Sequence, residues 1–463
     1  MSLKENLVIK AFLPLSAPPP YREVARHAQD LLRELSSFSG VSLQVIDSAK
    51  ESSDVEQREV IQEAQAVGVK LSRLSSVYGG RQVLLEVPYG ISLAYLNRRE
   101  VTAPVELLAE VEFQLARAIT TVVEGRPKTR IGVAQGFGEP DLINSPLARH
   151  LGSEGELIPV RLDGEPLEDQ ISALVVLGAT QSYGERARWL IHRLRCDGGG
   201  VVIALDHRVQ SELFSEVWAP RPTGLEPLLR QYGIEVDHQW VIGDLSNPTP
   251  APLKRDARGH VIAATHALYP LGRGKKDHPI TAPIAQVPIP MSPLFTPPRS
   301  AHLIVQSEAS AEAFRGLRGL DVTQGSERKS SEEGFPLAFA LEQHLSECEE
   351  SLSELAAQDL ASSQPIQRTG LAPSRMVVIG SGRRLLSADP RGLELLMNSI
   401  AWVRGEERLL SLKDRRPVPK SLNLSLDEQR LIQWTSPILP ALVAFFIAFI
   451  LRVPRAKEEK GHP

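Results

Sequence analysis

Polar residues with scope for chemistry stand where predicted buried strands end. Asp206 and His207 follow one apolar run, and Gly380-Ser381-Gly382 follows another. The carboxyl ends of strands are where open α/β sheets place ligand-binding and catalytic groups. We therefore take Asp206, His207, Gly380 and Ser381 as a candidate ligand or partner surface. The more ordinary alternative for Asp206 and His207 is structural, in which they cap a helix or tie a loop.

An acyl-transfer nucleophile is missing from the place where this kind of fold would hold it. In α/β hydrolases and amidotransferases, a Ser or Cys stands on a sharp turn between a strand and a helix, flanked by glycines. The apolar run 173–177 is followed by the stretch 178–182, Gly-Ala-Thr-Gln-Ser. Neither Gly-x-Ser-x-Gly nor Gly-x-Cys-x-Gly occurs in the sequence. The sequence therefore predicts a protein with no catalytic residues of this type.

Nucleotide and metal motifs are also incomplete. Gly380-Ser381-Gly382 is similar to the start of a phosphate-binding loop, but Leu385 occupies the place of the third glycine in Gly-x-Gly-x-x-Gly. Gly-x-x-x-x-Gly-Lys-Ser/Thr is absent, so the chain is not an ATPase of the P-loop type. His260, His266 and His278 share one region, but their spacing matches no zinc motif. We expect no cofactor and no metal, and keep His278 only as a candidate surface residue.

Composition excludes several classes of protein. The chain has 463 residues, a net charge of −4 and 5% aromatic residues. A nucleic-acid binder would show a basic face or tail, so no nucleic-acid partner is expected. With two cysteines, Cys196 and Cys348, the chain cannot be a disulfide scaffold.

The first 126 residues form one α/β pattern, which we assign to a domain 1–126. The order of predicted elements is β-α-β-α-β-β-α, and it resembles that of a thioredoxin-like domain. Because Cys-x-x-Cys is absent, dithiol redox chemistry is excluded. The predicted strands are 7–12, 41–46, 81–87 and 91–96, and the predicted helices are 21–37, 55–67 and 105–123.

A second α/β pattern follows a short junction and defines a domain 127–412. Apolar strand-like runs alternate with helical patterns, which predicts a doubly wound parallel sheet. The Pro- and Gly-rich stretch 243–300 and the polar stretch 319–334 are predicted to be loop excursions. The segment 346–373 is of low complexity.

The end of the sequence has the properties of a membrane anchor. No charged residue occurs in the window 431–451, and about 20 apolar residues suffice to cross a bilayer. We predict a transmembrane helix at 431–452, after a juxtamembrane linker at 413–430 and before a basic tail at 453–463. The alternative is a buried core helix.

The orientation that this anchor implies conflicts with the start of the sequence. The positive-inside rule places the basic tail in the cytoplasm, so the body would be periplasmic and the protein a single-pass component of a bacterial inner membrane. An export signal is not visible at the N-terminus. Either a leading segment is missing from this sequence, or the body is cytosolic and the protein is tail-anchored. We favour the first.

Several segments, taken in order, resemble the gliding-motility type ABC transporter auxiliary family (GldG-like). The resemblance extends over nearly the whole chain, and the order of the motifs is more specific than any one of them. The segments are 18–24, 111–119, 198–206, 277–281, 334–338, 377–381 and 397–403.

The resemblance implies a fold, a role and partners. The second domain would be similar to a class I amidotransferase domain without its catalytic residues. The role would be that of a non-catalytic, membrane-anchored auxiliary component. Its candidate ligand would be a small molecule or a polymer of unknown identity. Its partners would be the permease and ATPase subunits of an ABC transport system. The alternative function is a membrane-tethered hydrolase or carbohydrate-active enzyme with an unrecognised active site.

Overall fold

The computed structural model describes most of the chain up to Lys413. Residues 414–463, and with them the predicted membrane helix 431–452 and tail 453–463, lie outside the described residues, as does the segment 346–373. Among the described residues, no helix combines the length and apolar character needed to cross a membrane. The described residues are 5–50, 53–78, 81–102, 104, 108–125, 129–145, 147–152, 155–164, 171–210, 218–255, 261–317, 321–322, 325–343 and 374–413.

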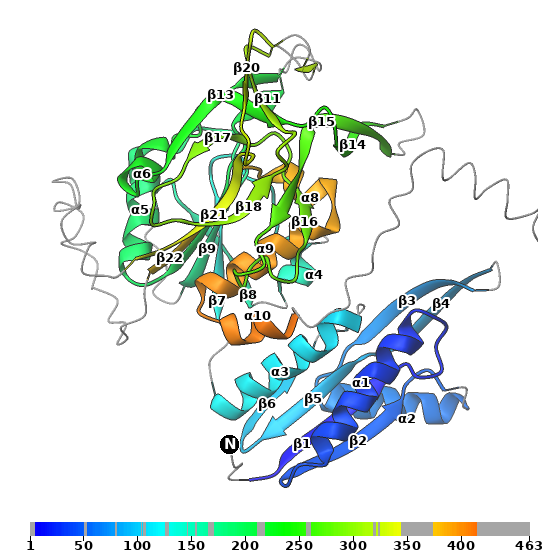
Figure 1. Cartoon of the computed structure of the whole chain (residues 1–463). Coiled ribbons are helices and arrows are strands. Elements are labelled where there is room, and N and C mark those ends of the chain that lie inside the picture. Colours follow the sequence, from blue (N-terminus) through cyan, green and yellow to red (C-terminus); the bar gives the residue numbers. More distant parts are fainter. Residues whose placement is uncertain are drawn as a thin grey trace, which may run out of the picture. The chain divides into compact units, whose positions relative to one another are not determined.

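The N-terminal region contains a mixed sheet with the strand order β2-β1-β5-β6 and a separate hairpin, β3-β4 (Figure 1). Strand β1 pairs parallel with β2 and antiparallel with β5. The elements are β1 (Leu7–Leu13), α1 (Tyr21–Ser36), β2 (Val41–Asp47), α2 (Asp54–Ala66), β3 (Leu71–Tyr78), β4 (Arg81–Pro88), β5 (Gly90–Tyr95), β6 (Arg98–Val101) and α3 (Leu108–Glu124).

Alternation along β1 explains how helices cover this sheet. Leu7, Ile9 and Ala11 are buried together with residues of α1 and α3. Phe12 belongs to the opposite face and packs with Ala64 of α2. Successive side chains of a strand point to opposite faces, so both faces of β1 are covered by helices.

Two strands of this region, β3 and β6, were not expected from the sequence. Strand β4 pairs with β3, from Leu71 opposite Pro88 to Tyr78 opposite Arg81, and β5 pairs with β1 and β6 instead of β4. The two predicted strands 81–87 and 91–96 are therefore consecutive in the chain but belong to different sheets. Strand β3 was missed because serines interrupt its apolar pattern, although the glycines between Tyr78 and Arg81 are a hairpin signal.

The larger region is built on one long mixed sheet with the strand order β14-β15-β18-β21-β22-β10-β9-β7-β8. Its elements are β7 (Arg130–Gln135), α4 (Ala148–Leu151), β8 (Glu156–Arg161), β9 (Ile171–Leu177), α5 (Glu185–Cys196), β10 (Gly200–Ala204), β11 (Arg208–Gln210), β12 (Trp218–Pro220), α6 (Glu226–Gln231), β13 (Glu235–Gly243), β14 (Pro248–Arg255), β15 (Val261–Gly274), β16 (Gln286–Pro288), β17 (Pro293–Thr296), β18 (His302–Ser307), β19 (Glu312–Arg315), β20 (Glu327–Ser330), β21 (Pro336–Gln343), β22 (Ser374–Ile379), α8 (Arg383–Ala388), α9 (Pro390–Val403) and α10 (Glu407–Lys413).

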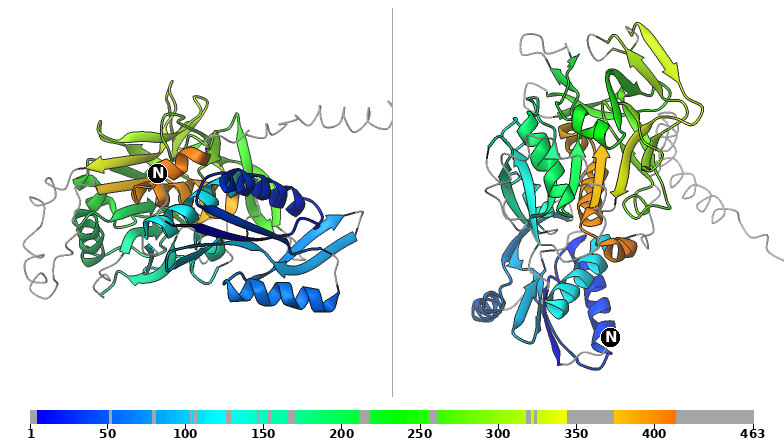
Figure 2. Two further views of the ribbon diagram at one scale, coloured as in Figure 1. Left: turned by 90° about the horizontal axis from the view of Figure 1, so that it is seen from below. Right: turned by 90° about the vertical axis from the view of Figure 1, so that its left-hand side faces the viewer.

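One part of this sheet is parallel and is covered by helices on both faces (Figures 1 and 2). Strands β8, β7, β9, β10 and β22 all run in the same direction. Val201 and Ile203 of β10 pack with α5 and α6, and Val202 and Ala204 pack with α9. These strands are apolar at nearly every position because both of their faces are buried. The mixed α/β class predicted from the sequence is confirmed.

The other part of the sheet is antiparallel, which the sequence did not predict. Strands β21, β18, β15 and β14 continue the sheet beyond β22 in antiparallel pairs. The stretch 243–300 thus contains strands and is not a loop excursion. Pro248, Pro250 and Pro252 occupy alternate positions of β14, which pairs only with β15 in the described part of the chain. Proline is tolerated on such an edge strand because the outward-facing positions need no amide donor.

A smaller sheet has the order β17-β13-β19-β20. Trp240 and Ile242 of β13 belong to the same core cluster as buried residues of the long sheet. The last strand of the smaller sheet, β20, pairs antiparallel with β19. The predicted loop 319–334 therefore contains a strand, whose residues are all exposed. An exposed strand carries no apolar alternation, so hydrophobic pattern could not reveal it.

Candidate functional site

The candidate site lies at the carboxyl end of the parallel strands. The strand order places β7 between β8 and β9, so the connections leaving β7 and β9 diverge. That divergence is the position at which open α/β sheets bind ligands. The turns after β7 and β9 are joined there, because the N–H groups of Thr180 and Gln181 donate to the Phe137 carbonyl oxygen at 3.0 and 2.8 Å.

Asp206 is bonded to the turn that follows β22. Its Oδ1 accepts a hydrogen bond from the Gly382 N–H at 2.9 Å, and its Oδ2 accepts one from the Arg383 N–H at 3.1 Å. These are the amide donors that a phosphate-binding loop would offer to a ligand. In this protein a carboxylate of the same chain occupies them. Asp206 therefore ties the ends of β10 and β22 together, as the structural alternative anticipated.

Arg383 joins the same turn to two others. Its Nε donates to the Gly178 carbonyl oxygen at 2.8 Å, and its Nη2 donates to the Gly138 carbonyl oxygen. A second arginine, Arg221, donates from Nη2 to the Ala179 carbonyl oxygen at 2.6 Å. Two guanidinium groups thus meet the turn after β9 at consecutive carbonyl groups. Both arginine side chains are half-buried.

Close backbone contact accounts for the glycines of this site. Gly178 has φ +57°, and a Cβ on Gly382 would lie 2.6 Å from the Gly178 Cα. A Cβ on Gly380 would lie 2.0 Å from the Ser292 Oγ. Both distances are shorter than the closest approach of a real Cβ atom to a neighbouring heavy atom, which is about 3.0 Å. Glycine is required here so that the turns after β9 and β22 can touch, which is a packing requirement that does not depend on a ligand.

Tyr183 closes one side of the site. Its hydroxyl group donates to Glu139 Oε1 at 2.6 Å, and the other oxygen of Glu139 accepts the Phe137 N–H at 2.8 Å. Burial raises the pKa of Tyr183 far above its usual value, and the negative charge of Glu139 raises it further. The phenol is therefore a neutral hydrogen-bond donor. It holds Glu139 as part of the framework of the site.

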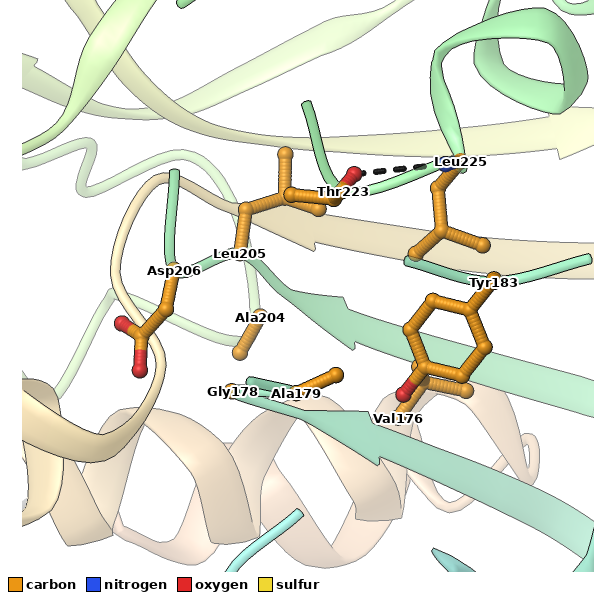
Figure 3. Close-up of a pocket in the computed structure, with 9 residues that line it drawn as sticks. All are labelled: Val176, Gly178, Ala179, Tyr183, Ala204, Leu205, Asp206, Thr223 and Leu225. Atoms are coloured by element: carbon orange, nitrogen blue, oxygen red, sulfur yellow. Dashed lines mark hydrogen bonds between the residues drawn. The ribbon is translucent and has the colours of Figure 1, made fainter. Parts of the chain in front are cut away.

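The pocket between these turns is small (Figure 3). Its volume is about 10 Å³, close to the space that one water molecule needs. Pockets for drug-sized ligands measure roughly 300–1,000 Å³. A metabolite could not enter it without movement of the surrounding turns. The lining residues are Val176, Gly178, Ala179, Tyr183, Ala204, Leu205, Asp206, Thr223 and Leu225.

His207 and Ser381 are next to these turns but are buried. Each has 1% of its surface exposed, and among the described residues neither His207 Nε2 nor Ser381 Oγ has a hydrogen-bond partner. Burial lowers the pKa of His207 well below its usual value, and the positive charge of Arg208 lowers it further. The imidazole is therefore neutral. Its side chain offers no surface to a partner in this conformation.

His278 lies away from the other candidate residues. Its ring is 5.2 Å from the Trp402 ring and 6.0 Å from the His302 ring. Trp402 is near the end of α9, where a Cβ on Gly200, the first residue of β10, would meet Val403. His278 is thus near the amino ends of the parallel strands. The structure brings Asp206, His207, Gly380 and Ser381 together at the carboxyl ends of the parallel strands. It places His278 near their amino ends.

The sequence interpretation missed Arg221 and Arg383. Neither belongs to a motif, and a single arginine after a glycine or before a proline carries no distinctive signal. The pair Arg383-Arg384 directly after the glycine turn was the one available hint. Within the described ranges, no group of three or more His, Cys, Asp or Glu side chains could hold a metal ion.

Comparison with known proteins decides the family. The model of the family described as an ABC-type uncharacterized transport system matches residues 128–388. The chain belongs to this family. It is accordingly an auxiliary component of an ABC-type transport system, and the family resemblance seen in the sequence is confirmed.

Comparisons with curated proteins and with solved structures give no further information about this family member. None of the curated proteins matches the chain. One similar solved structure is the mmIFT52 N-terminal domain, with 11% sequence identity and a TM-score of 0.37, covering 59% of this chain and 97% of that structure. A likeness at this level supports no conclusion about fold or function.

Proposed function

We propose that this chain is a non-catalytic, membrane-anchored auxiliary component that works beside separate permease and ATPase subunits. Its family membership supports the transport role. The non-catalytic role is supported by the contacts of the turn after β9. In the position of a nucleophile elbow, this turn binds Arg383 through the Gly178 carbonyl oxygen, and the neighbouring amide donors bind Asp206. The polar groups at this edge hold the turns in place.

We also propose the domain organisation on the basis of the strand order. The order β2-β1-β5-β6, with helices on both faces, supports a thioredoxin-like domain at 1–126 into which the hairpin β3-β4 is inserted. The parallel strands in the order β8-β7-β9-β10-β22 support an amidotransferase-like domain at 127–412. The boundary between them falls in the short junction before β7.

The proposed anchor is the predicted helix at 431–452, whose window 431–451 contains no charged residue. Its composition supports a single membrane-spanning helix. The basic residues of 453–463 support a cytoplasmic tail, which would place the body in the periplasm of a bacterial inner membrane.

Copurification tests this function. The full-length chain, carrying an affinity tag, is expressed in its host and extracted from membranes with detergent. We expect the permease and ATPase subunits of an ABC transport system to copurify with it. A variant lacking residues 431–463 should lose both partners, whereas a variant lacking only 453–463 should keep them. Failure of both subunits to copurify with the intact chain would contradict the proposal.

A second measurement addresses catalysis. The purified protein is assayed against ester and glycoside substrates. We expect no turnover above that of a mock preparation. Turnover that is lost in an Asp206→Ala or His207→Ala variant that still folds would instead support the membrane-tethered hydrolase or carbohydrate-active enzyme.

A further inference from the structure

Arg221 and Arg383 are held side by side although both are positively charged. They donate to the consecutive carbonyl groups of Ala179 and Gly178. Burial lowers the pKa of Arg221, the negative charge of Asp206 raises it, and the positive charge of Arg383 lowers it again. Both guanidinium groups also act on the buried phenol of Tyr183. Their proximity follows from the contacts with these two consecutive carbonyl groups.

Among the described residues, neither arginine forms an ion pair. Each nearby carboxylate has other hydrogen-bond partners. Both oxygens of Asp206 accept main-chain N–H groups. Glu139 accepts the Tyr183 hydroxyl group, and Glu226 accepts the N–H groups of Thr223 and Gly224 at 2.7 and 2.8 Å.

The guanidinium groups retain unused donors. Arginine has five N–H donors. Arg221 uses Nη2 for the Ala179 carbonyl oxygen, and Arg383 uses Nε and Nη2 for two other carbonyl oxygens. Among the described residues, the Nη1 group of each has no hydrogen-bond partner. Because both side chains are half-buried, an ion from solvent can reach them.

We propose that Arg221 and Arg383 form an oxyanion-binding pair at the carboxyl end of β9. The group that fits is a carboxylate or a phosphate, because planar guanidinium groups bind such oxygens with charge-assisted hydrogen bonds. The oxyanion adds to the negative charge of Asp206 in offsetting the repulsion between the two arginines. Since the adjoining pocket holds about 10 Å³, the rest of the ligand stays outside the sheet edge. The pair does not depend on the proposed transport partners.

The test measures binding of simple anions to the full-length protein in detergent. Thermal unfolding is followed by tryptophan fluorescence during titration with sodium phosphate and, separately, sodium acetate. Sodium chloride keeps the ionic strength constant. We expect the melting temperature to rise with phosphate or acetate in a saturable way, because a ligand that binds the native state stabilises it. The anion with the larger effect identifies phosphate or carboxylate as the preferred group.

Matched variants locate the effect. Arg221→Gln and Arg383→Gln should each weaken the apparent Kd about tenfold or more, because each removes charge-assisted hydrogen bonds. Arg99→Gln is the control, since Arg99 is an exposed arginine of β6 that also donates to a main-chain carbonyl group, that of Ala66. It should leave the Kd unchanged.

Two outcomes would overturn the proposal. One is a wild-type melting temperature that responds to phosphate and acetate no more than to chloride. The other is an Arg221→Gln variant that binds like the wild type. If Arg383→Gln does not fold, because Arg383 holds two turns together, the wild type and Arg221→Gln still decide the question.

Discussion

The Asp206 carboxylate accepts a hydrogen bond at 3.1 Å from the main-chain N–H of Arg383, a residue 177 positions away in the chain. A second bond, from the Gly382 N–H at 2.9 Å, completes the contact. The same arginine reaches back with its side chain to the turn after β9. One carboxylate and one arginine thus connect the ends of β9, β10 and β22. They lie at the carboxyl ends of the parallel strands, where open α/β sheets place ligand-binding and catalytic groups.

Replacing Asp206 by Asn should destabilise the protein. An amide side chain can accept only one of the two N–H groups, and its own NH2 group would face the other. We expect a loss of about 1–3 kcal/mol in the free energy of unfolding, measured by chemical denaturation of the full-length protein. Asp237→Asn is the control, because Asp237 accepts one N–H, from Gln239, at an exposed position of β13. Equal effects of the two substitutions would show that the Asp206 contact contributes nothing special.

Adding a methyl group to Gly382 should separate two turns. A Cβ at this position would lie 2.6 Å from the Gly178 Cα and 2.8 Å from the Gly178 N. We therefore expect Gly382→Ala to reduce the free energy of unfolding by about 1–3 kcal/mol. In Gly164→Ala the new Cβ would meet nothing within 4 Å, so its effect should stay within about 0.5 kcal/mol. A tolerated Gly382→Ala would mean that these turns do not pack as closely as described.

His278 should make stability fall in mild acid. Burial, with a smaller contribution from the positive charge of His302, lowers the pKa of His278 from 6.5 to about 4. As pH falls below 6.5, the unfolded chain binds a proton that the folded protein rejects. The stability present above pH 6.5 is therefore lost progressively down to about pH 4, by up to about 2–3 kcal/mol.

The pH dependence of a variant isolates this effect. His278→Gln should flatten the curve of unfolding free energy between pH 6.5 and 4, whatever its effect at neutral pH. His27→Gln, which replaces an exposed histidine of α1, is the matched control. An identical slope in His278→Gln and the wild type would assign the acid sensitivity to other groups.

Removing residues 431–463 should release the body from membranes. The window 431–451 contains no charged residue, and each charge at the centre of a membrane helix would cost about 2.5–3.5 kcal/mol. We expect the truncated protein in the supernatant after ultracentrifugation of cell extracts. The variant lacking only 453–463 should still sediment with membranes. Sedimentation of both variants would contradict a single C-terminal anchor.

Local pattern predicted the part of the fold that is apolar on both faces. β9 and β10 were visible as solid apolar runs, because strands covered by helices on both sides need such residues throughout. β14 and β20 were not visible, because an edge strand with alternating prolines and a fully exposed strand carry no apolar periodicity. The hairpin β3-β4 was missed for a similar reason.

The sequence alone determined the mixed α/β class, the family resemblance and the missing nucleophile motif, because these depend on residue types and short spacings. It also placed Asp206 at the end of a strand. Only the tertiary structure decided what that carboxylate contacts. β10 pairs with β9 on one side and with β22 on the other, and this strand order brings Arg221 and Arg383 to consecutive carbonyl groups. Strand order depends on contacts between distant residues, which no local pattern encodes.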